Sequence, residues 1–140
     1  MMQKIGPIIS DKAEKFIREH FSNLNAGAVY VLDAFPDLYA RTLHDLKGKF
    51  SRGELMLILD VTNGLALNPG LAGQHLLVQV SDGIELDGLD KKWKVTKKNV
   101  TSNLQSLNTF QIACLEIWAG AFWEKEDHGN IEEYVKRLAK

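Results

Sequence analysis

The sequence has only one cysteine, Cys114, so it cannot form a disulfide within the chain. It also lacks an excess of charge of either sign, because 17 basic residues stand against 18 acidic residues and the net charge is −1. The chain as a whole therefore has no general attraction for nucleic-acid phosphates or for anionic lipid. A role in binding nucleic acid would need a local basic patch.

Long apolar runs are missing too. The apolar run Leu55–Leu59 is followed at once by Asp60, and no stretch reaches the ~18 apolar residues that a membrane span needs. Residues 1–10 lack the apolar run of a secretory signal. Together with the single cysteine, these absences predict a cytoplasmic protein that does not enter a membrane.

The short motifs of the commonest enzymes are absent as well. The chain contains no Gly-x-Ser-x-Gly, Walker A, Gly-x-Gly-x-x-Gly or His-Glu-x-x-His pattern. Its histidines have no spacing that would put two metal ligands on one helical turn; they are His20, His44, His75 and His128. Cys114 sits in the middle of an apolar stretch, which favours an inert core thiol. We therefore predict no metal, no cofactor and no catalytic residue.

What is present is a globular composition with helical periodicity. Apolar residues make up 45% of the chain and charged residues 25%, and apolar positions recur every three or four residues. This pattern predicts an all-α fold, a single compact but irregular bundle of about six or seven helices, neither a coiled coil nor a solenoid. We expect residues 1–9 to form a flexible N-terminal arm and residues 10–140 a single helical domain.

Residues 26–50 allow two interpretations. Ala28–Leu32 suits either a short buried strand or a helix, whereas the aromatic and leucine residues after it keep helical spacing. Proline fits the first turn of a helix and breaks the interior, so Pro36 favours a helix that begins near Asp33. A longer, kinked helix is the alternative. In either case Gly48 is expected to end the helix.

Two segments are expected to lie in the centre of the fold. Ser51 and Glu54 match the capping box that opens a helix, and the helix that follows is apolar on nearly every side until Asn63. Asn108 and Gln111 form a similar pair before the most apolar long segment of the chain. Between these segments, the spacing predicts one helix from about residue 72 to 94, with a bend at Gly88.

The sharpest charge feature is a basic segment that surrounds Trp93. It consists of Lys91, Lys92, Lys94, Lys97 and Lys98. These lysines could hold phosphates beside an aromatic stacking surface. They could equally form ordinary i,i+4 pairs with upstream acids on an exposed helix. The second interpretation is favoured, because acidic residues directly upstream would repel the same phosphates.

Trp93 and Trp123 are the only sequence signals of a protein interface. Trp123 follows Phe122, so both side chains can be buried only if two sides of their helix are covered, by the fold or by a second chain. The leading hypothesis is therefore a non-enzymatic helical interaction or regulatory protein that binds another protein or itself. The alternatives are a nucleic-acid-binding regulator using the basic segment, and a small enzyme with a site assembled by the fold around His75 or His44.

Overall fold

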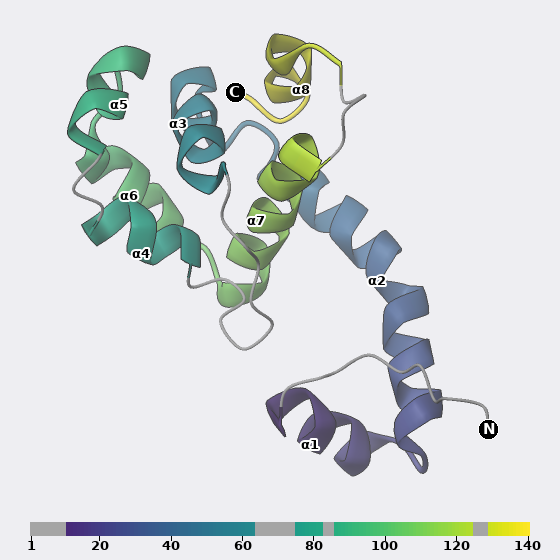
Figure 1. Ribbon diagram of the computed structural model, residues 1–140. Helices are drawn as coiled ribbons and strands as arrows, with labels where there is room; N and C mark the ends of the chain where they lie inside the picture. Colours follow the sequence, from purple (N-terminus) through teal and green to yellow (C-terminus); the bar gives the residue numbers. More distant parts are fainter. Residues whose placement is uncertain (1–10, 64–74, 83–85, 125–128) are drawn as a thin grey trace. The chain divides into compact units, whose positions relative to one another are not determined.

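The computed structural model describes residues 11–63, 75–82, 86–124 and 129–140 (Figure 1). Helices are the only regular elements within these ranges, so the all-α prediction is confirmed. They are α1 (Asp11–His20), α2 (Leu24–Leu46), α3 (Arg52–Thr62), α4 (His75–Asp82), α5 (Leu86–Trp93), α6 (Lys97–Gln105), α7 (Thr109–Glu124) and α8 (Ile131–Lys136). No helix in the described ranges is long and apolar enough to cross a membrane. The arm predicted for residues 1–9 lies outside the described residues.

Contacts between residues divide the chain into two compact units, Met1–Ala40 and Arg41–Lys140. The first contains α1 and most of α2, and the second contains residues 41–46 of α2 and the remaining helices. The single domain expected over residues 10–140 stays a prediction.

In the first unit, α1 packs on the start of α2 through a glycine. Ile17 of α1 is only 5% exposed. A Cβ atom added at Gly27 would lie 2.4 Å from Cγ2 of Ile17 and 2.8 Å from Cγ of Phe21. The two helices can therefore approach this closely only because residue 27 has no side chain.

The predicted start of α2 near Asp33 is wrong, because the helix begins at Leu24 and continues through Pro36. Asn23 stabilises the earlier start: its side-chain Oδ1 accepts a hydrogen bond from the N–H of Ala26 at 3.0 Å, satisfying one free donor of the first turn. That cap and the contact at Gly27 offset the one backbone hydrogen bond that a proline removes. The strand interpretation of Ala28–Leu32 is excluded.

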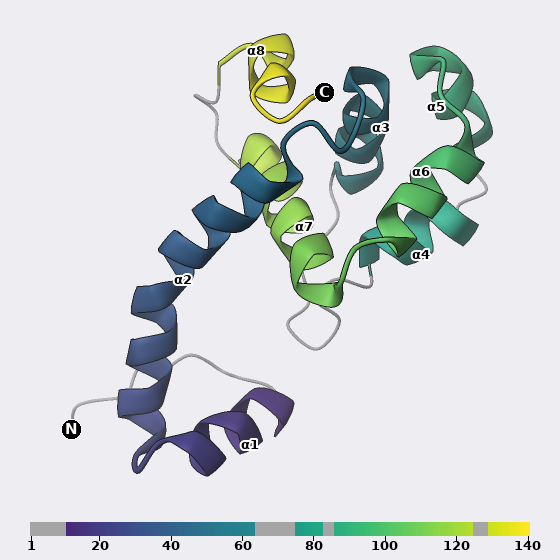
Figure 2. The same cartoon turned by 180° about the vertical axis from the view of Figure 1, so that it is seen from behind.

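In the second unit, α3 is the central helix. It contacts α4, α5, α7 and α8, and it lies between α5 and α8 in both views (Figures 1 and 2). Every side chain of Leu55–Leu59 is at most 3% exposed. The capping box that opens α3 is present in both halves, with Ser51 and Glu54 each accepting a hydrogen bond from the other's backbone N–H. The predicted central position is confirmed.

Helix α7 packs against α3 and α4 and is buried on most sides. The reciprocal hydrogen bonds of Asn108 and Gln111 precede it as predicted, at 2.8 and 2.9 Å. Cys114 is fully buried, and desolvation raises the pKa of its thiol, as expected for an inert core cysteine. Glu116 is also buried, and its Oε2 accepts a hydrogen bond from the backbone N–H of Leu76 at 3.0 Å. The carboxylate thereby caps the first turn of α4.

The single helix predicted for residues 72–94 is two helices, which makes eight in the described residues rather than six or seven. Helix α4 packs on α3, α6 and α7, whereas α5 packs on α3 alone among its stronger contacts. The two helices therefore share α3 as a neighbour, and α4 also contacts α6 and α7. Gly88 lies within α5 rather than at a bend.

The end of the chain is joined to the loop between α2 and α3. Gly48 has a φ angle of 84° and its N–H donates to the carbonyl of Leu138 at 3.0 Å. The N–H of Lys140 donates to the carbonyl of Phe50 at 2.9 Å. The prediction that α2 stops at Gly48 is confirmed, because glycine adopts this left-handed backbone without steric cost.

Candidate functional site

The basic segment is spread over the end of α5, the linker and the start of α6. Lys92 places its Nζ 3.8 Å from Oδ2 of Asp60 on α3. Lys94 follows the last residue of α5 and has a φ angle of 57°, so it ends that helix instead of extending it. Lys97 is half-buried. The upstream acids that could pair with these lysines, Asp87 and Asp90, have side chains outside the described part of the chain.

Trp93 connects α5 to α3. Its indole Nε1–H donates to Oδ2 of Asp60 at 2.6 Å. Two cations approach the ring, with Nζ of Lys92 4.8 Å and Cζ of Arg52 5.9 Å from its centroid. At Gly53, an added Cβ would lie only 2.6 Å from the carbonyl oxygen of Trp93. These contacts give Trp93 a structural role, while its role in an interface stays a prediction.

Trp123 connects α7 to α3 in a similar way. Its indole Nε1–H donates to the carbonyl of Leu59 at 2.8 Å. Its ring meets Phe122 edge to face, with centroids 4.9 Å apart. The side chain is half-buried, and its polar group is satisfied within the chain. An interface role for Trp123 likewise remains untested.

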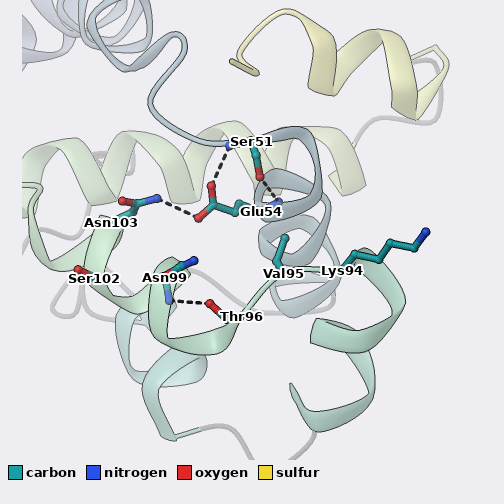
Figure 3. Close-up of a pocket in the computed structure, with 8 residues that line it drawn as sticks. All are labelled: Ser51, Glu54, Lys94, Val95, Thr96, Asn99, Ser102 and Asn103. Carbon is teal, nitrogen blue, oxygen red and sulfur yellow. Dashed lines mark hydrogen bonds between the residues drawn. The ribbon is translucent and has the colours of Figure 1, made fainter.

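A polar pocket of about 420 Å³ lies between the start of α3 and helix α6 (Figure 3). Its lining residues are Ser51, Glu54, Lys94, Val95, Thr96, Asn99, Ser102 and Asn103. The carboxylate of Glu54 accepts hydrogen bonds from the N–H of Ser51 and the side-chain amide of Asn103, both at 2.9 Å. Lys94 points away from that carboxylate. The pocket can hydrogen-bond a small polar molecule through its hydroxyl and amide side chains.

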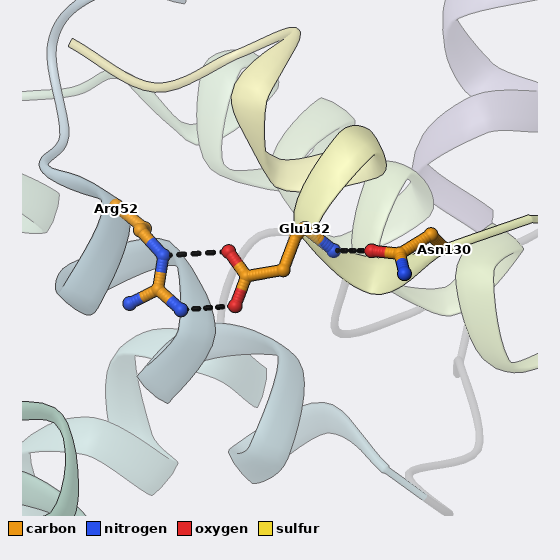
Figure 4. Close-up of polar contacts among 3 residues, drawn as sticks. All are labelled: Arg52, Asn130 and Glu132. Atoms are coloured by element: carbon orange, nitrogen blue, oxygen red, sulfur yellow. Dashed lines mark hydrogen bonds and ion pairs between the residues drawn. The ribbon is translucent and has the colours of Figure 1, made fainter.

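An exposed ion pair joins the beginnings of α3 and α8 (Figure 4). The guanidinium of Arg52 donates from Nε and Nη2 to the two carboxylate oxygens of Glu132, with an Nε to Oε2 distance of 2.7 Å. Asn130 caps the same helix by accepting a hydrogen bond from the N–H of Glu132 at 2.7 Å. Pairing lowers the pKa of Glu132 and raises that of Arg52. This arrangement positions α8.

The first unit carries a set of large apolar side chains in contact with solvent, which we name the apolar surface. Its members and their exposed fractions are Phe16 (51%), Val29 (49%), Tyr30 (67%), Val31 (39%), Leu32 (58%) and Leu38 (45%). Four of them are consecutive in α2. Because an α-helix completes a turn in about 3.6 residues, consecutive positions 29–32 point to all sides of the helix.

Sequence reasoning missed this surface because residues 28–32 were open to a strand interpretation. The signal was nevertheless there, since no charged or amide side chain occurs between Ala26 and Leu32. A helix without polar residues for more than one turn presents apolar side chains to solvent, unless it is covered all round.

Of the two histidines named for an enzyme site, His44 is exposed on α2, and the side chain of His75 lies outside the described part of the chain. A site around either histidine stays a prediction. The described residues contain no group of three His, Cys, Asp or Glu side chains that could hold a metal ion.

Comparisons with protein-family models, with curated proteins and with solved structures found no match to this chain.

Proposed function

We propose that this chain is a non-enzymatic interaction protein of the cytoplasm that binds a protein partner through the apolar surface. The observation that carries the proposal is the run of four consecutive apolar residues, Val29–Leu32, each between 39% and 67% exposed. Single exposed apolar residues are common on folded proteins, whereas a large exposed apolar area marks an interaction site.

The extent of the apolar surface supports this proposal. At roughly 150–200 Å² for a fully exposed side chain of this size, the exposed fractions amount to about 500 Å². The largest apolar patch on a typical monomeric protein is about 300–600 Å² and is often functional. Because its members face different sides of α2, a partner that covers them must extend around the helix.

The second unit offers weaker support for the other candidate functions. In the basic segment, the ammonium of Lys92 lies close to Asp60 and to the ring of Trp93. The Lys92 ammonium and the Trp93 indole therefore already have contacts within the chain that a nucleic acid would have to replace. The polar pocket has both oxygens of Glu54 engaged in hydrogen bonds within the chain. Neither feature explains why α2 exposes so much apolar area.

Site-specific photocrosslinking in the cells that express the full chain tests the proposal. A benzophenone amino acid at position 32 should give a discrete crosslinked product with a protein. The same group at Gln105, which is exposed on α6, serves as the matched control and should give none. If position 32 gives no product, or only the products seen from position 105, the apolar surface is not a binding surface.

A further inference from the structure

We infer that the polar pocket between α3 and α6 binds a small organic amine in its protonated form, through the carboxylate of Glu54. The pocket lies in the second unit and the apolar surface in the first, so this inference goes beyond the proposed function, and either can fail without the other. Three observations carry it: a buried carboxylate without a cationic partner, a lining rich in hydrogen-bond acceptors, and the scarcity of apolar side chains around the pocket.

Glu54 brings a negative charge to the pocket without a cation to balance it. The residue is 9% exposed and lines the pocket. Its carboxylate accepts hydrogen bonds from two neutral donors, the N–H of Ser51 and the side-chain amide of Asn103. No cationic side chain of the described residues forms an ion pair with it. Because buried glutamates are usually paired with a cation, the unbalanced carboxylate indicates that a ligand supplies the missing positive charge.

The capping box of α3 explains only one of the two carboxylate oxygens. Oε1 accepts from the N–H of Ser51 and closes the first turn of α3, whereas Oε2 accepts from Asn103 on α6 (Figure 3). A carboxylate oxygen can accept two hydrogen bonds, so each oxygen has room for one more donor. The carboxylate of Glu54 therefore joins α3 to α6 and can still receive the N–H groups of an ammonium.

The rest of the lining supplies acceptors for the other protons of an ammonium group. An ammonium has three N–H donors and no acceptor. Hydroxyl or amide oxygens are present on Ser51, Thr96, Asn99, Ser102 and Asn103. The hydroxyl of Thr96 accepts from the N–H of Asn99 at 3.2 Å and can accept a second hydrogen bond. Lys94 points away from the carboxylate, so its own ammonium does not take the place of a ligand (Figure 3).

The size and polarity of the pocket favour a compact polar amine over a lysine side chain of another protein. Its volume of about 420 Å³ lies within the range of about 300–1,000 Å³ that is usual for small-molecule sites. Among the described residues that line it, Val95 alone is apolar. The four-carbon stem of a lysine would leave water with little apolar surface to cover it. A short amine that also carries a hydroxyl group can form hydrogen bonds at both ends.

The lysines near the pocket favour a ligand with a single positive charge. Lys94, Lys97 and Lys98 belong to the basic segment and repel cations. Lys94 and Lys98 are exposed, so solvent and salt screen their charges more than that of the buried Glu54. A compound with several ammonium groups would add to this repulsion, and the described lining offers no second carboxylate to offset it.

Two-dimensional proton–nitrogen NMR of the full chain, titrated with ethanolamine at neutral pH, tests the inference. Ethanolamine is the probe because it carries one ammonium and one hydroxyl group. The backbone N–H signals of Ser51 and Asn99 and the side-chain amide signal of Asn103 should shift and saturate, with a Kd in the millimolar range for so small a molecule. Ethylene glycol, in which a hydroxyl replaces the ammonium, should bind at least about tenfold more weakly. The amine n-butylamine, which has the apolar stem of a lysine, should also bind more weakly than ethanolamine.

Glu54→Gln separates the charge of the carboxylate from its structural contacts. Glutamine keeps an oxygen for the capping box but has no charge, so ethanolamine should bind at least about tenfold more weakly. Glu133→Gln removes the same charge from an exposed position on α8 outside the lining, and its Kd should stay within about twofold of wild type. Far-ultraviolet circular dichroism checks that the helices remain. If Glu54→Gln loses them, Ser102→Lys replaces it, because a lysine at this exposed lining position should compete with ethanolamine for Glu54.

Weaker binding of ethanolamine by Glu54→Gln, but not by Glu133→Gln, supports the inference. The absence of any shift in wild type up to about 100 mM ethanolamine overturns it. Equal binding of ethylene glycol would overturn the selection of a cation, and tighter binding of n-butylamine would overturn the selection of a compact polar amine. None of these results changes the outcome of crosslinking from position 32, which tests the apolar surface separately.

Discussion

Replacing Gly53 by alanine should separate α3 from α5. The added Cβ would lie 2.6 Å from the carbonyl oxygen of Trp93 and 2.9 Å from Cγ1 of Val95. Since the first of these atoms belongs to the backbone, it cannot rotate away, and one helix must shift. Overpacking of this kind costs about 1–3 kcal/mol, while alanine gains about 0.5–1 kcal/mol over glycine as a helix former. We expect the free energy of unfolding to fall by about 1–2 kcal/mol.

Gly88→Ala is the matched control, because Gly88 lies within α5 and an added Cβ would meet nothing within 4 Å. Only the gain in helix propensity remains there, so this variant should be about 0.5–1 kcal/mol more stable than wild type. Urea unfolding followed by circular dichroism measures the free energy of unfolding of both variants. In thermal unfolding, the Tm should move by about 4 °C per kcal/mol. A Gly53→Ala variant as stable as wild type, or a destabilised Gly88→Ala, would refute the packing described for α3 and α5.

The other predictions concern single polar or backbone contacts. Glu116→Ala should lower the free energy of unfolding by about 2–4 kcal/mol, because the N–H of Leu76 loses its acceptor. Glu116→Gln keeps an acceptor and should lower it by about 1 kcal/mol. Equal losses for the two variants in urea titrations would argue against the cap. Pairing with Arg52 lowers the pKa of Glu132, so the stability it contributes is present above the ordinary carboxyl pKa and is lost as pH falls through the lowered value. Unfolding measured from neutral to acid pH should therefore lose less stability in Glu132→Gln than in wild type, and an identical pH dependence would contradict the pair. Gly48→Ala forces a side chain into a φ angle of 84° and should raise the unfolding rate, with a loss of about 1–2 kcal/mol; no change would mean that the turn adopts another conformation.

The central helices of the second unit could be predicted because their signals are local. A capping box depends on two residues three positions apart, so Ser51 with Glu54 is visible in the sequence before any tertiary contact is known. The same holds for Asn108 with Gln111. The dense apolar residues of these two helices then leave no solvent-facing side, which fixes them in the interior.

The start of α2 could not be predicted, because it depends on a contact between helices. Pro36 argues against a helix interior when it is considered alone. The opposing contribution comes from Gly27, whose missing side chain lets Ile17 approach. This contact joins residues of two different helices, and the spacing of apolar residues within one segment does not predict it.

The contacts of the candidate site residues could not be predicted from the sequence either. The sequence marks Trp93 and Trp123 as unusual, but the acceptors of their indole N–H groups, Asp60 and the Leu59 carbonyl, lie 33 and 64 residues away. Glu116 caps a helix 40 residues distant. Long-range pairings of this kind follow from how the helices pack, which single-sequence patterns do not specify.

Amide hydrogen exchange of the full chain, alone and with the protein that crosslinks to position 32, tests most directly whether the apolar surface is a binding surface. Exchange reports how often backbone hydrogen bonds open to solvent, and a covered helix opens less often. We expect peptides spanning residues 28–40 to become more protected when the partner is added, while peptides from α6 keep the same protection in both samples. Unchanged protection of residues 28–40 in the presence of the partner would contradict binding through this surface.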